Sequence, residues 1–109
     1  MEQVMKVRIN PYAIKNDLHD LKPEQKDRIF EKLDELEQSP LEHEKVGPVF
    51  RHGYKIFKMK ITEDELHHRA LFDIIDGDVK VFGFMTRPPE EYTKETLREK
   101  VGRRENDSF

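Results

Sequence analysis

The stretch that decides the fold is residues 67–85, HHRALFDIIDGDVKVFGFM, which follows the run YKIFKMK at residues 54–60. Ile, Val and aromatic residues recur in these runs, which is typical of β-strands. Asp76-Gly77 interrupts the longer run and predicts a hairpin, because both residues tolerate the positive φ of a tight turn. We therefore expect antiparallel strands at about 49–60, 66–75 and 79–85.

The N-terminal part of the chain reads as a strand followed by a helical hairpin. Residues 4–9, VMKVRI, alternate loosely and predict the strand. Asn10 then offers an N-cap, and Pro11 suits the first position of a helix. Apolar residues on one face predict a short first helix: Ile14, Leu18 and Leu21. Pro23 begins a second helix, which ends before Pro40.

A last helix is expected at about 93–104, and residues 105–109 are expected to fray. The order of these elements is strand, two helices, three antiparallel strands and a helix. It indicates one α+β domain over residues 1–109, with the helices on one face of a curved antiparallel sheet of about four strands.

Composition limits the classes of function. The chain has no cysteine and no apolar run near the roughly 18 residues that a membrane span needs, so we expect a cytoplasmic protein with no membrane contact. Its net charge is −3, which is unusual for a protein that holds nucleic acid. The charge is uneven, however, because residues 49–104 carry 12 Lys and Arg against 10 Asp and Glu.

Several segments, taken in order, resemble the RelE/ParE superfamily of type II toxin–antitoxin systems, and the RelE branch more than the ParE branch. They are residues 33–40 (LDELEQSP), Val46-Gly47 with residues 54–56 (YKI), residues 68–76 (HRALFDIID), and Arg87 with Tyr92. The resemblance implies a RelE-like fold and a metal-independent, ribosome-dependent mRNA endoribonuclease that inhibits translation. It implies no cofactor. Its implied partners are a neutralising antitoxin protein, the ribosome and mRNA.

The resemblance also implies roles for individual residues in the attack of a ribose 2′-OH on the adjacent phosphate. Arg69 would stabilise the transition-state phosphate, and Arg87 would neutralise or protonate the leaving oxygen. Tyr92 would stack on a base or take the proton. The RNA backbone would be held by three lysines: Lys55, Lys58 and Lys60.

Two further pairs of residues are candidates for a role. His67 and His68 are candidate general bases, since imidazole titrates near neutral pH. Leu97 and Val101 form an apolar stripe that either closes the core or contacts an antitoxin helix. The remaining histidines are scattered, so no metal site is expected.

One departure from the family pattern keeps other functions open. Residues 88–91, PPEE, separate Arg87 from Tyr92 and place two carboxylates beside the expected phosphate site. The alternative is a catalytically inactive RelE-fold protein that binds another regulatory protein as a regulator or antagonist, of a phage or plasmid type. A ParE-like gyrase inhibitor ranks lower, because such relatives generally lack the catalytic set that is partly present here.

Overall fold

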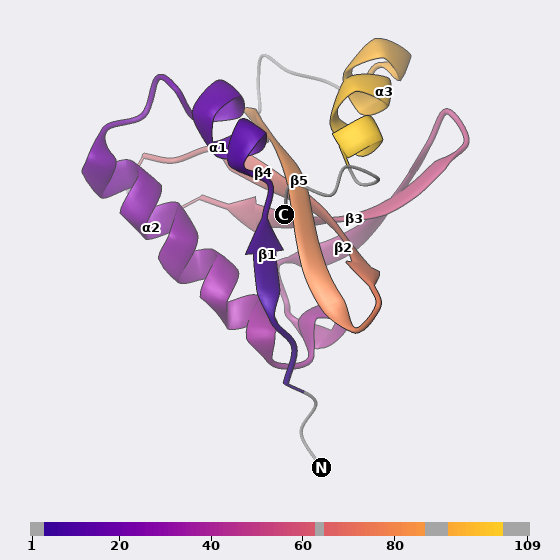
Figure 1. Cartoon of the computed structure of the whole chain (residues 1–109), viewed down its shortest axis with the longest axis horizontal. Coiled ribbons are helices and arrows are strands. Elements are labelled where there is room, and N and C mark those ends of the chain that lie inside the picture. Colours follow the sequence, from indigo (N-terminus) through magenta and orange to yellow (C-terminus); the bar gives the residue numbers. More distant parts are fainter. Residues whose placement is uncertain (1–3, 63–64, 87–91, 104–109) are drawn as a thin grey trace.

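The computed structural model describes residues 4–62, 65–86 and 92–103, which form a five-stranded sheet and three α-helices (Figure 1). The strands are β1 (Val7–Ile9), β2 (Val46–Arg51), β3 (Tyr54–Ile61), β4 (His68–Ile75) and β5 (Asp78–Thr86). The helices are α1 (Pro11–Asp17), α2 (Pro23–Asp34) and α3 (Lys94–Gly102), and the short 3-10 helices η1 (Glu35–Glu37) and η2 (Pro40–Glu42) follow α2. None of the described helices is long and apolar enough to cross a membrane.

The sheet has the order β1-β5-β4-β3-β2. Every neighbouring pair is antiparallel except β1 and β5, which run parallel. The predicted α+β fold, with its N-terminal strand, helical hairpin and C-terminal helix, is confirmed. The sheet has five strands rather than about four, and it is mixed rather than purely antiparallel.

The additional strand comes from a hairpin that the sequence prediction missed. The single strand expected at about 49–60 is two strands, β2 and β3, joined at His52-Gly53. Both turn residues have positive φ, 52° at His52 and 83° at Gly53. The predicted Asp76-Gly77 turn has the same character, with φ of 54° and 80°. A histidine before glycine is a weaker turn signal than aspartate, so the first turn escaped the prediction.

The predicted cap of α1 is confirmed. The Oδ1 of Asn10 accepts hydrogen bonds from the backbone N–H groups of Tyr12 and Ala13, at 2.9 and 3.2 Å. These bonds satisfy donors that a helix N-terminus otherwise leaves open. The helix is shorter than expected and ends at Asp17, although Leu18 is still fully buried.

Helices cover both faces of the sheet, which corrects the expectation that they share one face. In Figure 1, α1 and α2 lie to the left of the sheet and α3 lies at the upper right. The cluster under α1 and α2 includes Leu18, Ile29, Leu33, Met59, Phe72 and Phe84. A separate cluster under α3 contains Val49, Ile56, Leu71, Phe82, Met85, Leu97 and Val101. Side chains alternate between the faces of a strand, so β3, β4 and β5 supply both clusters.

A β-bulge in β5 shapes the surface on which α3 packs. Leu71 pairs with Gly83 whereas Phe72 pairs with Val81, so Phe82 is an extra residue in β5. Phe82 fills the cluster under α3. A Cβ atom at Gly83 would lie 2.9 Å from the Cβ and 3.1 Å from the Cγ of Lys100. Gly83 therefore leaves room for the aliphatic stem of Lys100 to lie on the sheet.

A buried ion cluster joins α3 to α1 at the edge of β5. The Asp17 carboxylate accepts two hydrogen bonds from Arg103, at 2.7 and 3.2 Å, and lies 3.1 Å from the Nζ of Lys100. It also accepts the backbone N–H of Phe84 at 3.0 Å, while Arg103 donates to the carbonyl of Phe82 at 3.1 Å. Asp17 and Arg103 thus satisfy the Phe84 N–H and the Phe82 carbonyl of β5, which lie beyond the end of β1. Only 3% of the Asp17 side chain is exposed.

The pKa of the Asp17 carboxyl reflects this environment. Burial alone would raise this pKa. The Arg103 hydrogen bonds, the Phe84 N–H and the charges of Lys100 and Arg103 together outweigh burial, so the pKa lies below its ordinary value. A carboxyl whose pKa is lowered by folding stabilises the folded state above the unfolded pKa, and this contribution is lost as the pH falls through the folded pKa.

We expect Asp17→Asn to lower the free energy of unfolding at pH 7 by about 3–5 kcal/mol, because it removes the carboxylate that pairs with buried Lys100 and leaves Arg103 with only the exposed Glu99 among the described residues. The difference from wild type should begin to shrink below about pH 4, where the carboxyl of the unfolded chain takes up a proton, and should be lost only as the pH falls through the lower pKa of the folded state. Urea unfolding followed by circular dichroism from pH 7 downwards measures both effects. Asp20→Asn is the control, since 86% of that side chain is exposed. A difference that is independent of pH would contradict the assignment.

Gly83→Ala should destabilise the fold by about 1–3 kcal/mol, because the new methyl group overlaps the stem of Lys100 and pushes α3 off the sheet. Gly102→Ala is the matched control, since a Cβ there meets nothing within 4 Å and alanine favours a helix. Thermal unfolding of both variants measures the difference. Equal melting temperatures would show that α3 does not need the close approach at Gly83.

Candidate nucleic-acid interface

Arg69 is the centre of the candidate site. It lies on β4, where its Cα partners are Lys60 on β3 and Met85 on β5. Met85 belongs to the cluster under α3, so Arg69 projects on the same face of the sheet as α3. Only 4% of Arg69 is exposed. Its guanidinium carbon lies 4.4 Å from the centroid of the Tyr92 ring, which is a cation–π contact.

A hollow of about 170 Å³ opens beside Arg69. It is lined by residues from the ends of β3 and β4: Lys60, Thr62, His67, His68 and Arg69. Lys60 and Arg69 are directly opposed across the strands, and like charges in that position repel each other. An anion in the hollow would relieve this repulsion, and the guanidinium fork suits the oxygen atoms of a phosphate.

The structure separates the three lysines that the sequence grouped together. Lys58 and Lys60 are two residues apart on β3, so they share the face of Arg69. Lys55 has the opposite parity and lies across from Phe50 of β2, with its Nζ 5.9 Å from the Phe50 ring centroid. A site on the Arg69 face is therefore reached by Lys58 and Lys60, whereas Lys55 belongs to the other face of the hairpin.

The two candidate general bases both line the hollow, but they differ in exposure. His67 is exposed, whereas His68 is 8% exposed at the start of β4. His67 is thus the imidazole that a ligand in the hollow reaches more readily. Whether either of them acts as a base stays a prediction.

Tyr92 directly precedes Thr93, the N-cap of α3, and makes contacts on two sides. Its ring packs with Tyr54 against the cluster under α3 and covers the Arg69 guanidinium. Its carbonyl oxygen accepts a hydrogen bond of 3.1 Å from the Nε2 of His52, at the tip of the β2–β3 hairpin. Its hydroxyl is buried and has no hydrogen-bond partner among the described residues. The sequence prediction missed His52, whose only signal is its place in the turn.

The three other predicted site residues have different outcomes. Arg87 lies outside the described residues, so its role stays a prediction. Leu97 and Val101 are 0% and 4% exposed and pack into the cluster under α3. The structure thus supports their core role, and a partner can reach them only if α3 leaves the sheet.

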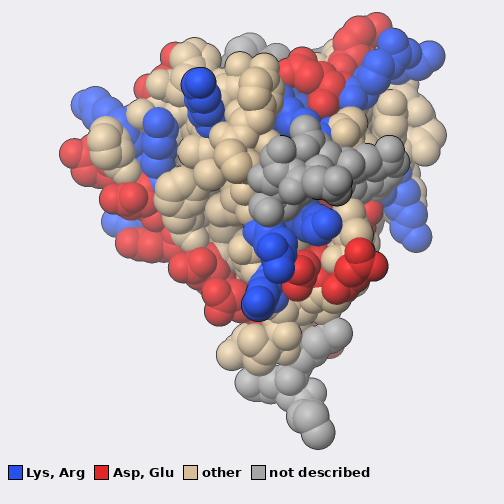
Figure 2. Space-filling view, viewed as in Figure 1, with Lys and Arg blue, Asp and Glu red and all other residues tan. Residues whose placement is uncertain are grey.

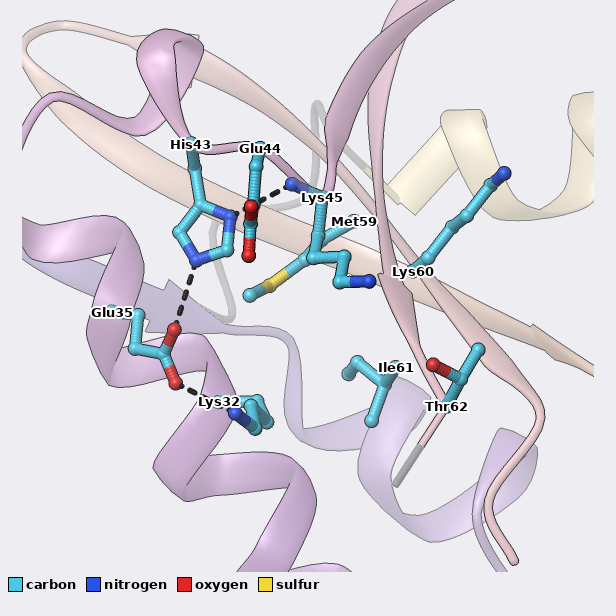
Figure 3. Close-up of a pocket in the computed structure, with 9 residues that line it drawn as sticks. All are labelled: Lys32, Glu35, His43, Glu44, Lys45, Met59, Lys60, Ile61 and Thr62. Atoms are coloured by element: carbon cyan, nitrogen blue, oxygen red, sulfur yellow. Dashed lines mark hydrogen bonds and ion pairs between the residues drawn. The ribbon is translucent and has the colours of Figure 1, made fainter.

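A second, smaller hollow of about 70 Å³ lies between the end of α2 and the start of β2 (Figure 3). His43 bridges its walls, because its Nδ1 accepts the backbone N–H of Lys45 at 3.0 Å and its Nε2 donates to Glu35 at 2.9 Å. Lys32 lies 3.1 Å from the same carboxylate. The His43 hydrogen bond outweighs the effect of burial, and with Lys32 it holds the pKa of Glu35 below its ordinary value.

The two hollows share Lys60 and Thr62, so they meet at the end of β3. The surface nearby is mixed rather than uniformly basic. Figure 2 shows acidic and basic side chains interspersed along the left margin of the molecule, where α2 lies in Figure 1. Within residues 4–62, 65–86 and 92–103, no group of three or more His, Asp or Glu side chains could hold a metal ion.

The fold of the chain is similar to that of solved RelE toxins. An archaeal RelE–RelB complex from Pyrococcus horikoshii OT3 aligns with a TM-score of 0.60 and 21% identity, over 80% of this chain and 99% of that chain. The E. coli toxin RelE, as a doubly substituted mutant in the free state, aligns with a TM-score of 0.62 and 20% identity, over 92% of this chain and 97% of that chain. No model of a protein family and no curated protein matches the sequence.

Substitutions at Tyr92 separate the role of the ring from that of the hydroxyl. Tyr92→Leu should lower the free energy of unfolding by about 1–2 kcal/mol, because the cation–π contact and part of the packing are lost. Tyr92→Phe should leave stability within about 0.5 kcal/mol of wild type or raise it, because it removes a buried hydroxyl without a described partner. Urea unfolding measures both. A Tyr92→Phe variant as unstable as Tyr92→Leu would show that the hydroxyl is bound.

Proposed function

We propose that this protein is a RelE-like toxin, a metal-independent and ribosome-dependent mRNA endoribonuclease that inhibits translation and is neutralised by an antitoxin. The observation that carries the proposal is the hollow beside Arg69, which brings together Lys60, Arg69 and His67. The RelE fold supports it as well, and one protein of that fold was solved in a RelE–RelB complex.

The chemistry requires that a 2′-OH lose its proton while the adjacent phosphate gains negative charge. In this proposal Arg69 and Lys60 stabilise that charge from the floor and wall of the hollow. The low exposure of Arg69 strengthens the interaction, because a charge in a partly dry site is screened less by water. His67 takes the proton, Arg87 assists the leaving 5′ oxygen, and Tyr92 positions the guanidinium and stacks on a base.

The burial of Arg69 also favours one alternative. A guanidinium that is 4% exposed and covered by the Tyr92 ring can serve as part of the packing under α3. The protein would then be an inactive RelE-fold regulator that acts by binding another protein. The net charge of −3 is consistent with that alternative. The two functions differ in whether substitution at Arg69 removes an activity or only stability.

We expect expression of the wild-type protein to stop growth, and Arg69→Ala to relieve the arrest. Cleavage of ribosome-bound mRNA, measured by primer extension, should fall by about 10²–10³-fold, as for other charge-stabilising donors. Arg98→Ala is the matched control, since Arg98 is exposed on α3 away from the hollow. Arg69→Lys retains a charge and should keep more activity than Arg69→Ala.

Circular dichroism separates loss of chemistry from loss of fold, because every variant is compared at a temperature where it is folded. Tyr92→Phe, which should be fully folded, tests the hydroxyl as a catalytic group. If the wild-type protein leaves translation and ribosome-bound mRNA intact, the nuclease proposal is contradicted and the inactive regulator is favoured.

A further inference from the structure

The hairpin formed by β2 and β3 has an unusual charge for this chain. Residues 45–62 contain five Lys and Arg and no Asp or Glu, although the whole chain carries 23 acidic residues against 20 basic ones. The basic residues are Lys45, Arg51, Lys55, Lys58 and Lys60. On the side to which this hairpin extends in Figure 1, Figure 2 shows basic side chains at the right-hand margin, with acidic side chains close to them at the upper right.

The tip of this hairpin stands away from the rest of the sheet. β3 pairs with β4 only from Phe57 to Ile61 within the described strands, whereas its pairing with β2 continues to Tyr54. β2 is the edge strand of the sheet. In Figure 1 the hairpin projects beyond the other strands as a two-stranded arm. Its tip, residues 50–55, is therefore reachable by a large ligand.

An aromatic platform lies on this arm. Phe50 is 58% exposed, and Lys55 is directly opposite it on β3. The Lys55 ammonium lies 5.9 Å from the Phe50 ring centroid, which restrains the ring at an exposed site. Arg51, the next residue, is also exposed; it lies on the other face of β2 and its guanidinium donates to the Phe50 carbonyl at 3.1 Å. A single exposed aromatic is ordinary on a protein surface. An exposed aromatic flanked by cations, on an arm without carboxylates, is the combination that suits single-stranded nucleic acid.

We propose that the tip of the β2–β3 hairpin is an RNA-binding arm, in which one nucleobase stacks on Phe50 and a flanking phosphate contacts Lys55. The arm adjoins the candidate site, because His52 at its tip donates to the Tyr92 carbonyl. The arm contributes affinity and not chemistry, since Phe50 and Lys55 lie on the opposite face of the strands from Arg69. This inference rests on the proposed function in one respect, that the ligand is RNA.

The test measures binding separately from cleavage. The probe is a fluorescein-labelled single-stranded RNA of about 12 nucleotides, within the usual range of site sizes. Fluorescence anisotropy gives its Kd for the full-length protein at several salt concentrations. Phe50→Ala should weaken binding about 5- to 100-fold, whereas Phe50→Tyr should bind like wild type because it keeps the ring. Lys55→Gln should weaken binding moderately and reduce the salt dependence by about one phosphate contact.

Leu41→Ala is the matched control, because Leu41 is 51% exposed and apolar but lies on η2 away from the arm. It should bind RNA like wild type. Phe50 is exposed, so its substitution should leave the fold intact, and circular dichroism verifies this. Equal affinities of wild type and Phe50→Ala, or no binding of the probe by wild type, would overturn the inference. The inference would also be overturned if Phe50→Ala no longer bound an antitoxin protein while its RNA affinity was unchanged. That result would assign the arm to a protein partner.

The proposed nuclease and the proposed arm fail in different ways. If the wild-type protein does not cleave ribosome-bound mRNA but Phe50→Ala weakens RNA binding, the RNA-binding arm is supported and the nuclease proposal is contradicted. If cleavage of mRNA depends on Arg69 but Phe50→Ala leaves the RNA affinity unchanged, the nuclease proposal is supported and the RNA-binding arm is contradicted.

Discussion

The carboxylate of Asp17 is the constraint on which the arrangement of the two sheet faces depends. It is a residue of α1, on one side of the sheet, and it binds Lys100 and Arg103 of the C-terminal segment that covers the other side. Burying three charges is costly, and the cost is met here because each oxygen of the carboxylate has a partner and the backbone of β5 joins the network. Because Tyr92 directly precedes Thr93, the N-cap of α3, this cluster also helps to fix where the Tyr92 ring lies over Arg69.

The candidate site uses charge differently. In the Asp17 cluster cations and an anion compensate each other, whereas Lys60 and Arg69 face each other as like charges at the hollow. An anion bound between two cations reduces their mutual repulsion. The ring of Tyr92 adds a cation–π contact to the guanidinium. A phosphate is therefore a better match for this hollow than a neutral ligand.

The hairpin arm and the hollow share β3 but use its two faces. Lys58 and Lys60 project with Arg69, and Lys55 projects with Phe50. The alternation of side chains along one strand thus gives two basic surfaces from a single run of lysines. His52 connects them, since it lies in the turn of the arm and contacts the Tyr92 backbone. A ligand bound at both surfaces would span the edge of the sheet, which is a more extended contact than a small molecule makes.

The sequence by itself determined the elements whose signals are local. The Asn10 cap, the Asp76-Gly77 turn and the start of α2 at Pro23 depend on neighbours along the chain, and all are found as predicted. Order and spacing also identified the RelE-like fold. The His52-Gly53 turn was missed because its residue pair is a weak local signal, although the fold imposes positive φ there. Only the tertiary structure decided that α3 covers the second face, that Asp17 binds Arg103 across 86 positions, and that Lys55 is separated from Lys58 and Lys60. These features arise from contacts between segments far apart in the chain and from the parity of strand positions once β2 and β3 pair, and neither is encoded in a local pattern.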